Sequence, residues 1–79
     1  MIDLTGPVPP YRQLARILRK RMADGTLPTG TRITESDITE EFEVARNTAR
    51  RALGILRDEG LIFTVPQRGS YVGTAPPDE

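Results

Sequence analysis

The spacing of the apolar residues changes once along this chain, at Gly60, and that change limits the folds that the chain can adopt. Before Gly60 the apolar residues recur every three or four positions, as in amphipathic helices. After Gly60 they alternate, at Leu61, Phe63 and Val65, as in short strands. The sequence therefore predicts a helical domain that ends in a small β-hairpin.

Helix signals divide the helical part into three segments. The first helix is expected to begin near Pro10, because proline is tolerated in a first turn, and to stop before Gly25. Thr34 is the expected N-cap of a second, short helix that ends near residue 42. After a tight turn at residues 43–44, a third helix is expected over about residues 45–59. The expected buried side chains are Tyr11, Leu14, Ile17, Leu18 and Met22 of the first helix, Ile38 and Phe42 of the second, and Ala49, Ala52, Leu53 and Leu56 of the third.

The hairpin is expected to turn at Pro66–Gly69 and to return over residues 70–73, with Tyr71 facing the core. Residues 31–33 are expected to add a very short strand. Ile55 falls outside the buried stripe of its helix, so it is expected either to pack under the hairpin or to mark a protein contact. The predicted organisation is a flexible arm at 1–9, a domain at 10–73 and a disordered tail at 74–79.

Composition excludes several classes of function. The 79 residues include no cysteine and no histidine, which removes disulfides, thiolate zinc sites and Cys or His nucleophiles. With no nucleophile–base pair, metal set or phosphate-binding loop, we expect no enzyme, no metal and no cofactor. The chain also has no long apolar run, so we expect a cytoplasmic protein with no membrane partner.

The charges are segregated along the chain although the eleven basic and eleven acidic residues sum to zero. Residues 35–43 hold five acids and no base, whereas residues 44–57 hold four arginines and no acid. On a helical wheel, Arg46, Arg50 and Arg57 of the third helix lie within about 40° of one another. The third helix is therefore expected to carry a basic face although the net charge of the chain is zero.

The same helix face carries Asn47, Thr48 and Arg51 beside the arginines. Arginine can form a fork of hydrogen bonds to guanine, asparagine can pair with adenine, and threonine can meet phosphate or a thymine methyl group. Two helices joined by a tight turn and followed by a hairpin have the element order of a winged helix-turn-helix. The predicted fold is thus mainly α: three helices plus a wing of two or three strands. An ordinary solvated helix face is the alternative reading of the basic side chains.

Five stretches of the chain resemble motifs of the N-terminal domain of GntR-family bacterial transcription regulators. They occur in the family's order and spacing, at Pro10–Ala15, Gly30–Ile38, Val44–Leu53, Glu59–Ile62 and Gln67–Val72. The third is similar to the most specific family motif, Val-Ser-Arg-x-Thr-Val-Arg-x-Ala-Leu. The resemblance implies a winged helix-turn-helix that binds double-stranded DNA.

The resemblance also implies roles for single residues of the third helix. Arg46 and Arg50 would contact bases or phosphates in the major groove. Thr48, with Asn47 beside it, would hold the phosphate backbone, and Arg51 extends the same polar sector.

Two further regions complete the expected interface. Glu35 matches a family position that lies close to DNA at the start of the second helix, and Gly69 with Arg68 would form a wing tip that approaches the minor groove. Glycine there allows close backbone approach. Among the basic residues of the first helix, Arg12 is the best candidate for a phosphate contact.

The chain departs from the family pattern at three positions and in its length. Glu43 replaces the usual glycine of the helix-turn-helix turn, so a left-handed conformation there is expected to be strained or absent. Ala45 replaces a serine N-cap, and Gln67 stands where a wing glycine is typical. Family members carry a C-terminal effector-binding domain that usually makes the dimer. We expect no small-molecule effector site in these 79 residues, which read as an excised domain or a stand-alone regulator.

We therefore predict a repressor of transcription that binds a specific DNA sequence, its operator, as a homodimer. A winged-helix module that binds protein and has lost DNA binding is the alternative, favoured by the zero net charge, Glu43 and the acidic second helix.

Overall fold

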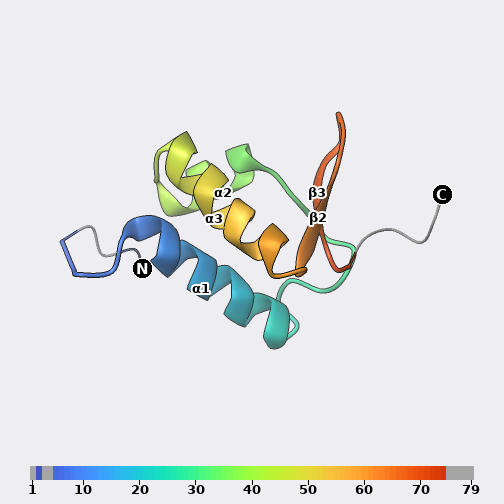
Figure 1. The fold of residues 1–79 in the computed structure, drawn as a ribbon, viewed down its shortest axis with the longest axis horizontal. Coiled ribbons are helices and arrows are strands. Elements are labelled where there is room, and N and C mark those ends of the chain that lie inside the picture. Colours follow the sequence, from blue (N-terminus) through green and yellow to red (C-terminus); the bar gives the residue numbers. More distant parts are fainter. Residues whose placement is uncertain (1, 3–4, 75–79) are drawn as a thin grey trace.

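The computed structural model describes residue 2 and residues 5–74, and in this part of the chain it contains three helices and a three-stranded antiparallel sheet (Figure 1). The strand order in the sheet is β1-β3-β2, and the β2–β3 hairpin stands beside the helices as a wing. The predicted winged helix-turn-helix is confirmed. Its elements, in chain order, are α1 (Pro10–Ala23), β1 (Arg32–Ile33), α2 (Glu35–Phe42), α3 (Arg46–Asp58), β2 (Ile62–Val65) and β3 (Gly69–Val72).

Helix α1 begins and ends where the sequence predicts. Proline occupies its first turn, Asp24 is its C-cap, and Gly25 follows with a φ of 87°. Ala15 is buried together with Leu14 and Leu18, whereas the predicted core residues Tyr11, Ile17 and Met22 are only half-buried. The buried stripe is thus narrower than expected. Helix α1 packs mainly against α3.

Helix α2 begins with a complete capping box. The hydroxyl of Thr34 accepts a hydrogen bond from the Asp37 backbone N–H at 3.1 Å, and the Asp37 carboxylate accepts one from the Thr34 N–H at 3.2 Å. Two N–H groups that helix geometry leaves without partners are satisfied in this way. The predicted N-cap is confirmed, and it fixes Glu35 as the first residue of α2.

The turn between α2 and α3 passes through the left-handed region at Glu43, with φ 54° and ψ 46°. Of the two expected outcomes, strained or absent, the structure shows the first: Glu43 adopts the left-handed conformation although it has a Cβ. For such a residue it costs about 1–2 kcal/mol. The N-cap of α3, Ala45, makes no side-chain hydrogen bond, as expected from its lack of a hydroxyl.

Helix α3 buries the predicted side chains, Ala49, Ala52, Leu53 and Leu56. It begins one residue later than expected, at Arg46. Ile55 packs against the core and lines a hollow with Ala15 and Arg16 of α1.

Tyr71 lies on the outer face of the wing, although it was expected to face the core. Ile62 and Val72, which pair across β2 and β3, are buried against the helices. Phe63 and Tyr71 also pair, and their rings stack at a centroid distance of 5.8 Å on the outer face. The prediction for Tyr71 was wrong because both faces of this hairpin carry apolar residues, and alternation alone does not show which face turns inward.

The predicted arm and tail lie largely beyond these elements. Among the described residues before α1, Ile2 packs against the core, and the Gln13 side-chain amide donates a hydrogen bond to the Val8 carbonyl at 2.6 Å. Residues 75–79 of the predicted tail lie outside the described residues.

Candidate nucleic-acid interface

The two arginines predicted to read DNA lie on the side of α3 that faces α2 and the wing. The side chains of Arg46 and Arg50 are 66% and 59% exposed, so both guanidinium groups are accessible to a partner. Ala49 and Leu53, which share the helix with them, are buried in the core. The position of the two arginines is thus set by the burial of the opposite stripe of α3.

Glu35 contacts both of these arginines. The Nε of Arg50 donates a hydrogen bond to Oε2 of Glu35 at 3.2 Å, and the Nε of Arg46 lies 3.9 Å from Oε1. The Glu35 side chain is only 33% exposed, and the capping box holds its helix end in place. One carboxylate therefore holds two cationic side chains side by side, an arrangement that sequence reasoning did not foresee.

A groove of about 300 Å³ separates these side chains from the wing. Arg57 crosses it, because its Nε donates a hydrogen bond to Oγ1 of Thr64 at 3.1 Å. The hydroxyl of Thr64 in turn lies 3.1 Å from that of the buried Ser70. The groove brings together three of the predicted site residues on α2 and α3 with Gly69 of the wing. Its lining includes Glu35, Arg46, Arg50, Arg57, Thr64 and Gly69.

Asn47 and Thr48 lie in the first turn of α3. Asn47 is exposed and Thr48 is half-buried. The first turn of α3 contains no acidic residue, so the positive end of the helix dipole is left uncompensated there. Both side chains stand where an anion could approach the end of the helix, although neither lines the groove.

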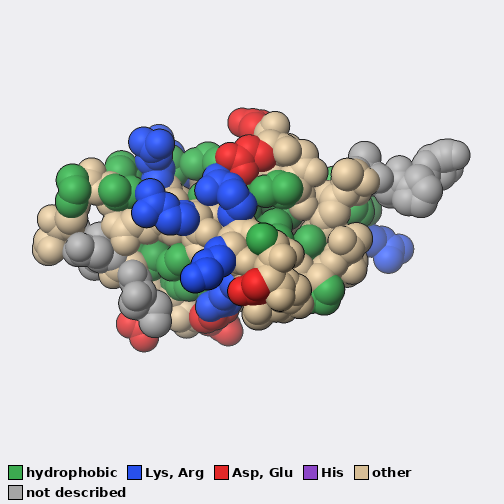
Figure 2. Space-filling model, turned by 90° about the horizontal axis from the view of Figure 1, so that it is seen from below, with side chains coloured by type: hydrophobic (Ala, Val, Ile, Leu, Met, Phe, Trp, Pro, Cys, Tyr) green, Lys and Arg blue, Asp and Glu red, His purple; other side chains and the backbone are tan. Residues whose placement is uncertain are grey.

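Arg51 and Arg12 lie on the side of the domain formed by α1. The guanidinium carbon of Arg51 lies 4.1 Å from the centre of the Tyr11 ring, which is a close cation–π contact. Arg12 is exposed beside a hollow that it shares with Arg16, Arg19 and Glu59. Figure 2 shows blue basic side chains gathered on one face of the helical part. The structure thus divides the predicted cations of the helices between the groove and the α1 side.

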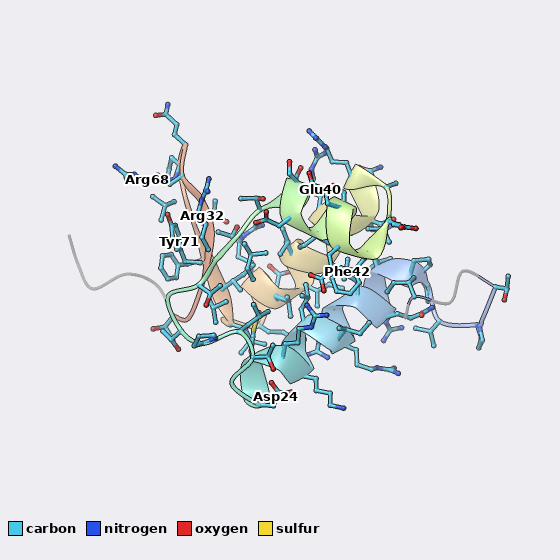
Figure 3. All side chains as sticks on the ribbon, turned by 180° about the vertical axis from the view of Figure 1, so that it is seen from behind. Asp24, Arg32, Glu40, Phe42, Arg68 and Tyr71 are labelled. Atoms are coloured by element: carbon cyan, nitrogen blue, oxygen red, sulfur yellow. The ribbon has the colours of Figure 1, made fainter. Side chains whose placement is uncertain are left out.

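Arg68 lies at the tip of the wing, next to Gly69 (Figure 3). Gln67, at the same turn, adopts a positive φ of 66°, a conformation usual for glycine. Arg32 of β1 also reaches this tip, because its Nε donates a hydrogen bond to the Arg68 carbonyl at 2.6 Å. No sequence pattern predicted that contact, since 36 residues separate its partners.

The fold and these positions can be compared with known proteins. The family described as bacterial regulatory proteins, gntR family, matches residues 10–72. The chain belongs to the GntR family. Residues 10–72 are the helix-turn-helix domain of that family, in agreement with the motifs read from the sequence.

Similar proteins include regulators and DNA-binding domains. The HTH-type transcriptional repressor RspR of Escherichia coli K12 is 39% identical over 64 residues, which cover 81% of this chain and 28% of RspR. YtrA from Sulfolobus acidocaldarius, a GntR-family transcription factor, superposes with a TM-score of 0.84 at 28% identity, over 96% of this chain and 81% of that structure. The AraR DNA-binding domain, solved in complex with operator ORR3, has a TM-score of 0.77 at 29% identity and covers 87% of this chain and 92% of that structure.

The chain spans less than a third of the length of RspR. The family is one of bacterial regulatory proteins, and RspR is a repressor of transcription. Across residue 2 and residues 5–74, no helix has the length and apolar character needed to cross a membrane.

Proposed function

We propose that this domain binds double-stranded DNA in a sequence-specific way and acts in a repressor of transcription. The observation that supports it best is the groove in which Arg46 and Arg50 stand, exposed and adjacent, opposite the glycine of the wing. Arginine pairs of this kind suit the acceptor-rich edge of guanine in the major groove. The AraR domain, of similar fold, was solved with its operator.

In the proposed complex, α3 enters the major groove. Arg46 and Arg50 form hydrogen bonds with base edges, and their contacts with the Glu35 carboxylate are broken or kept beside these bonds. Asn47 and Thr48, in the first turn of α3, bond to the phosphate backbone beside them, where the helix dipole adds attraction. These contacts set both the register on the duplex and the sequence preference.

The flanks of the domain add contacts that carry less sequence information. Gly69 and Arg68 at the tip of the wing approach the minor groove. Arg51, held over Tyr11, and Arg12 of α1 contact phosphates on the other side of α3. Glu35 keeps the two unbound arginines close to each other, which lowers the entropy lost when DNA binds.

Stable repression requires two copies of the domain. One set of major-groove contacts reads a single half-site, and two-fold operators are read by dimers. We propose a homodimer on DNA, in the bacterial cytoplasm, with no small-molecule effector site in these 79 residues.

The experiment that tests this function begins with a selection of bound duplexes from random DNA, followed by affinity measurements on the selected sequence. Arg46→Ala and Arg50→Ala should each weaken binding by about 1–3 kcal/mol and relax the preference at one base position. Lys20→Ala, which removes an exposed cation at the far end of α1, is the charge-matched control and should change the affinity little. Recovery of no common sequence, together with unchanged binding by Arg46→Ala, would reject the proposal.

A second candidate function is protein binding without DNA binding. It is favoured by the zero net charge and by the pairing of Glu35 with both reading arginines. Backbone amide shifts on adding duplex separate the two candidates. Shifts in the first two turns of α3 support DNA binding, whereas an unchanged spectrum supports the protein module.

A further inference from the structure

Arg32 extends along the wing toward its tip. Its backbone pairs with Tyr71 on β3, yet its Nε donates a hydrogen bond at 2.6 Å to the carbonyl of Arg68, three residues nearer the hairpin turn. Ile33 next to it is buried, so Arg32 lies on the opposite, outer face of the sheet. Figure 3 shows Arg32, Arg68 and Tyr71 together on the wing.

Gly69 lies against the guanidinium of Arg32, and a side chain at this position would crowd it. A Cβ added at Gly69 would lie 3.3 Å from Nε of Arg32 and 3.8 Å from its Nη2. Gly69 also has a φ of 115°, which other residues rarely adopt. The glycine therefore allows the backbone of the tip and the Arg32 side chain to lie in contact.

The positive charge of Arg32 has no carboxylate within ion-pair distance in residues 5–74. An arginine carries five N–H donors, and the wing uses the one on Nε. The other donors lie beside an open hollow on the outer side of the wing, lined by Arg32, Pro66, Gln67, Arg68 and Tyr71, none of them acidic. This surface is cationic, already oriented, and separate from the groove that contains Arg46 and Arg50.

We propose that Arg32 is a second DNA-contacting residue of the wing, which uses its free N–H groups to bind a backbone phosphate at the wall of the minor groove. The inference rests on the proposed function and adds a contact to it. A phosphate is the favoured partner because the guanidinium lies along the outer face of the sheet, where a wing inserted in the groove meets its wall. The bond to the Arg68 carbonyl holds the charge in place before DNA arrives, which reduces the entropy cost of the contact.

The test measures the affinity for the selected duplex as a function of salt. Arg32→Ala should weaken binding by about tenfold at moderate salt, and the slope of log affinity against log salt should fall by about one. The base preference at positions read by α3 should stay unchanged. Lys20→Ala is the matched control for the loss of an exposed cation, and Arg32→Gln repeats the test with a longer side chain if the alanine variant unfolds.

Gly69→Ala tests the seat of the side chain without removing the charge. It should weaken binding and lower the salt slope, and the double variant with Arg32→Ala should lose less than the sum of the two single losses. Additive losses would show that Gly69 acts independently and would overturn the proposed seat.

Two failures can be told apart. If Arg46→Ala relaxes base preference while Arg32→Ala leaves both the affinity and the salt slope unchanged, this inference is wrong and the proposed function stands. If neither variant changes the binding of any duplex, the proposed function itself is wrong.

Discussion

Glu35 and Arg50 are joined across the two helices of the helix-turn-helix, with Nε of Arg50 3.2 Å from Oε2 of Glu35. The same carboxylate lies 3.9 Å from Nε of Arg46 through its other oxygen. An acid at the centre of a surface proposed to bind a polyanion weakens the attraction for any phosphate, whatever the sequence. It also keeps both guanidinium groups close to one point on α2. The pairing should therefore favour specific over non-specific binding.

Glu35→Gln should separate these two effects. The amide keeps the size of the side chain and removes its charge, so affinity for duplexes of unrelated sequence should rise about two- to fivefold at low salt. The ratio of specific to non-specific affinity should fall. Fluorescence anisotropy with the selected duplex and with a scrambled one measures both.

Glu40→Gln is the control for this variant, because Glu40 is exposed on the same helix outside the groove lining. It should change the two affinities equally. A loss of specific binding in Glu35→Gln without any gain in non-specific binding would contradict the prediction, and would indicate that the carboxylate itself accepts a hydrogen bond from a base.

Ala45→Ser should stabilise the domain. Ala45 is the N-cap of α3 with extended backbone angles, φ −67° and ψ 154°, and it offers no side-chain acceptor to the first turn. A serine hydroxyl there should add about 1 kcal/mol to the free energy of unfolding, measured in urea. Ala23→Ser, in the exposed last turn of α1, lacks such a role and should give no gain. Equal changes in the free energy of unfolding of the two variants would show that a serine hydroxyl at position 45 does not stabilise the start of α3.

Gly54→Ala should also stabilise the domain. Gly54 lies within α3, where glycine costs about 0.5–1 kcal/mol relative to alanine, and an added Cβ would meet nothing within 4 Å. The melting temperature should rise by about 4 °C. Gly60→Ala is a close control, since its Cβ would also meet nothing but its φ is 78°. That variant should lose stability, and a gain there would contradict the argument from backbone conformation.

The helices were predictable from the sequence because their signals are local. The spacing of Ala49, Ala52, Leu53 and Leu56 shows one buried side of α3 directly, and Thr34 marks the start of α2 through its own hydroxyl. The same spacing placed Arg46 and Arg50 on one side of a helix, so that part of the candidate site followed from local geometry.

The rest of the site depends on contacts between distant segments. Period-two spacing fits the Ile62 and Val72 face and the Phe63 and Tyr71 face equally well, and only packing against the helices decides between them. The contact of Arg32 with the tip of the wing requires β1 to pair with β3. The sequence of a two-residue strand does not indicate which strand it pairs with. The Glu35 pairing likewise depends on the angle between α2 and α3.

Thr64→Val should weaken the connection between α3 and the wing. The Thr64 hydroxyl accepts a hydrogen bond from Nε of Arg57 at 3.1 Å and lies 3.1 Å from the hydroxyl of the buried Ser70. Valine keeps the shape and the preference for strand but removes both bonds, so the free energy of unfolding should fall by about 0.5–1.5 kcal/mol. The affinity for the selected duplex should fall more than this loss of stability explains, because the wing is no longer held at a fixed distance from α3. Thr64→Ser keeps the hydroxyl and should retain the affinity of the original chain. If the valine variant binds as tightly as the serine variant, the wing takes its position from DNA and not from Arg57.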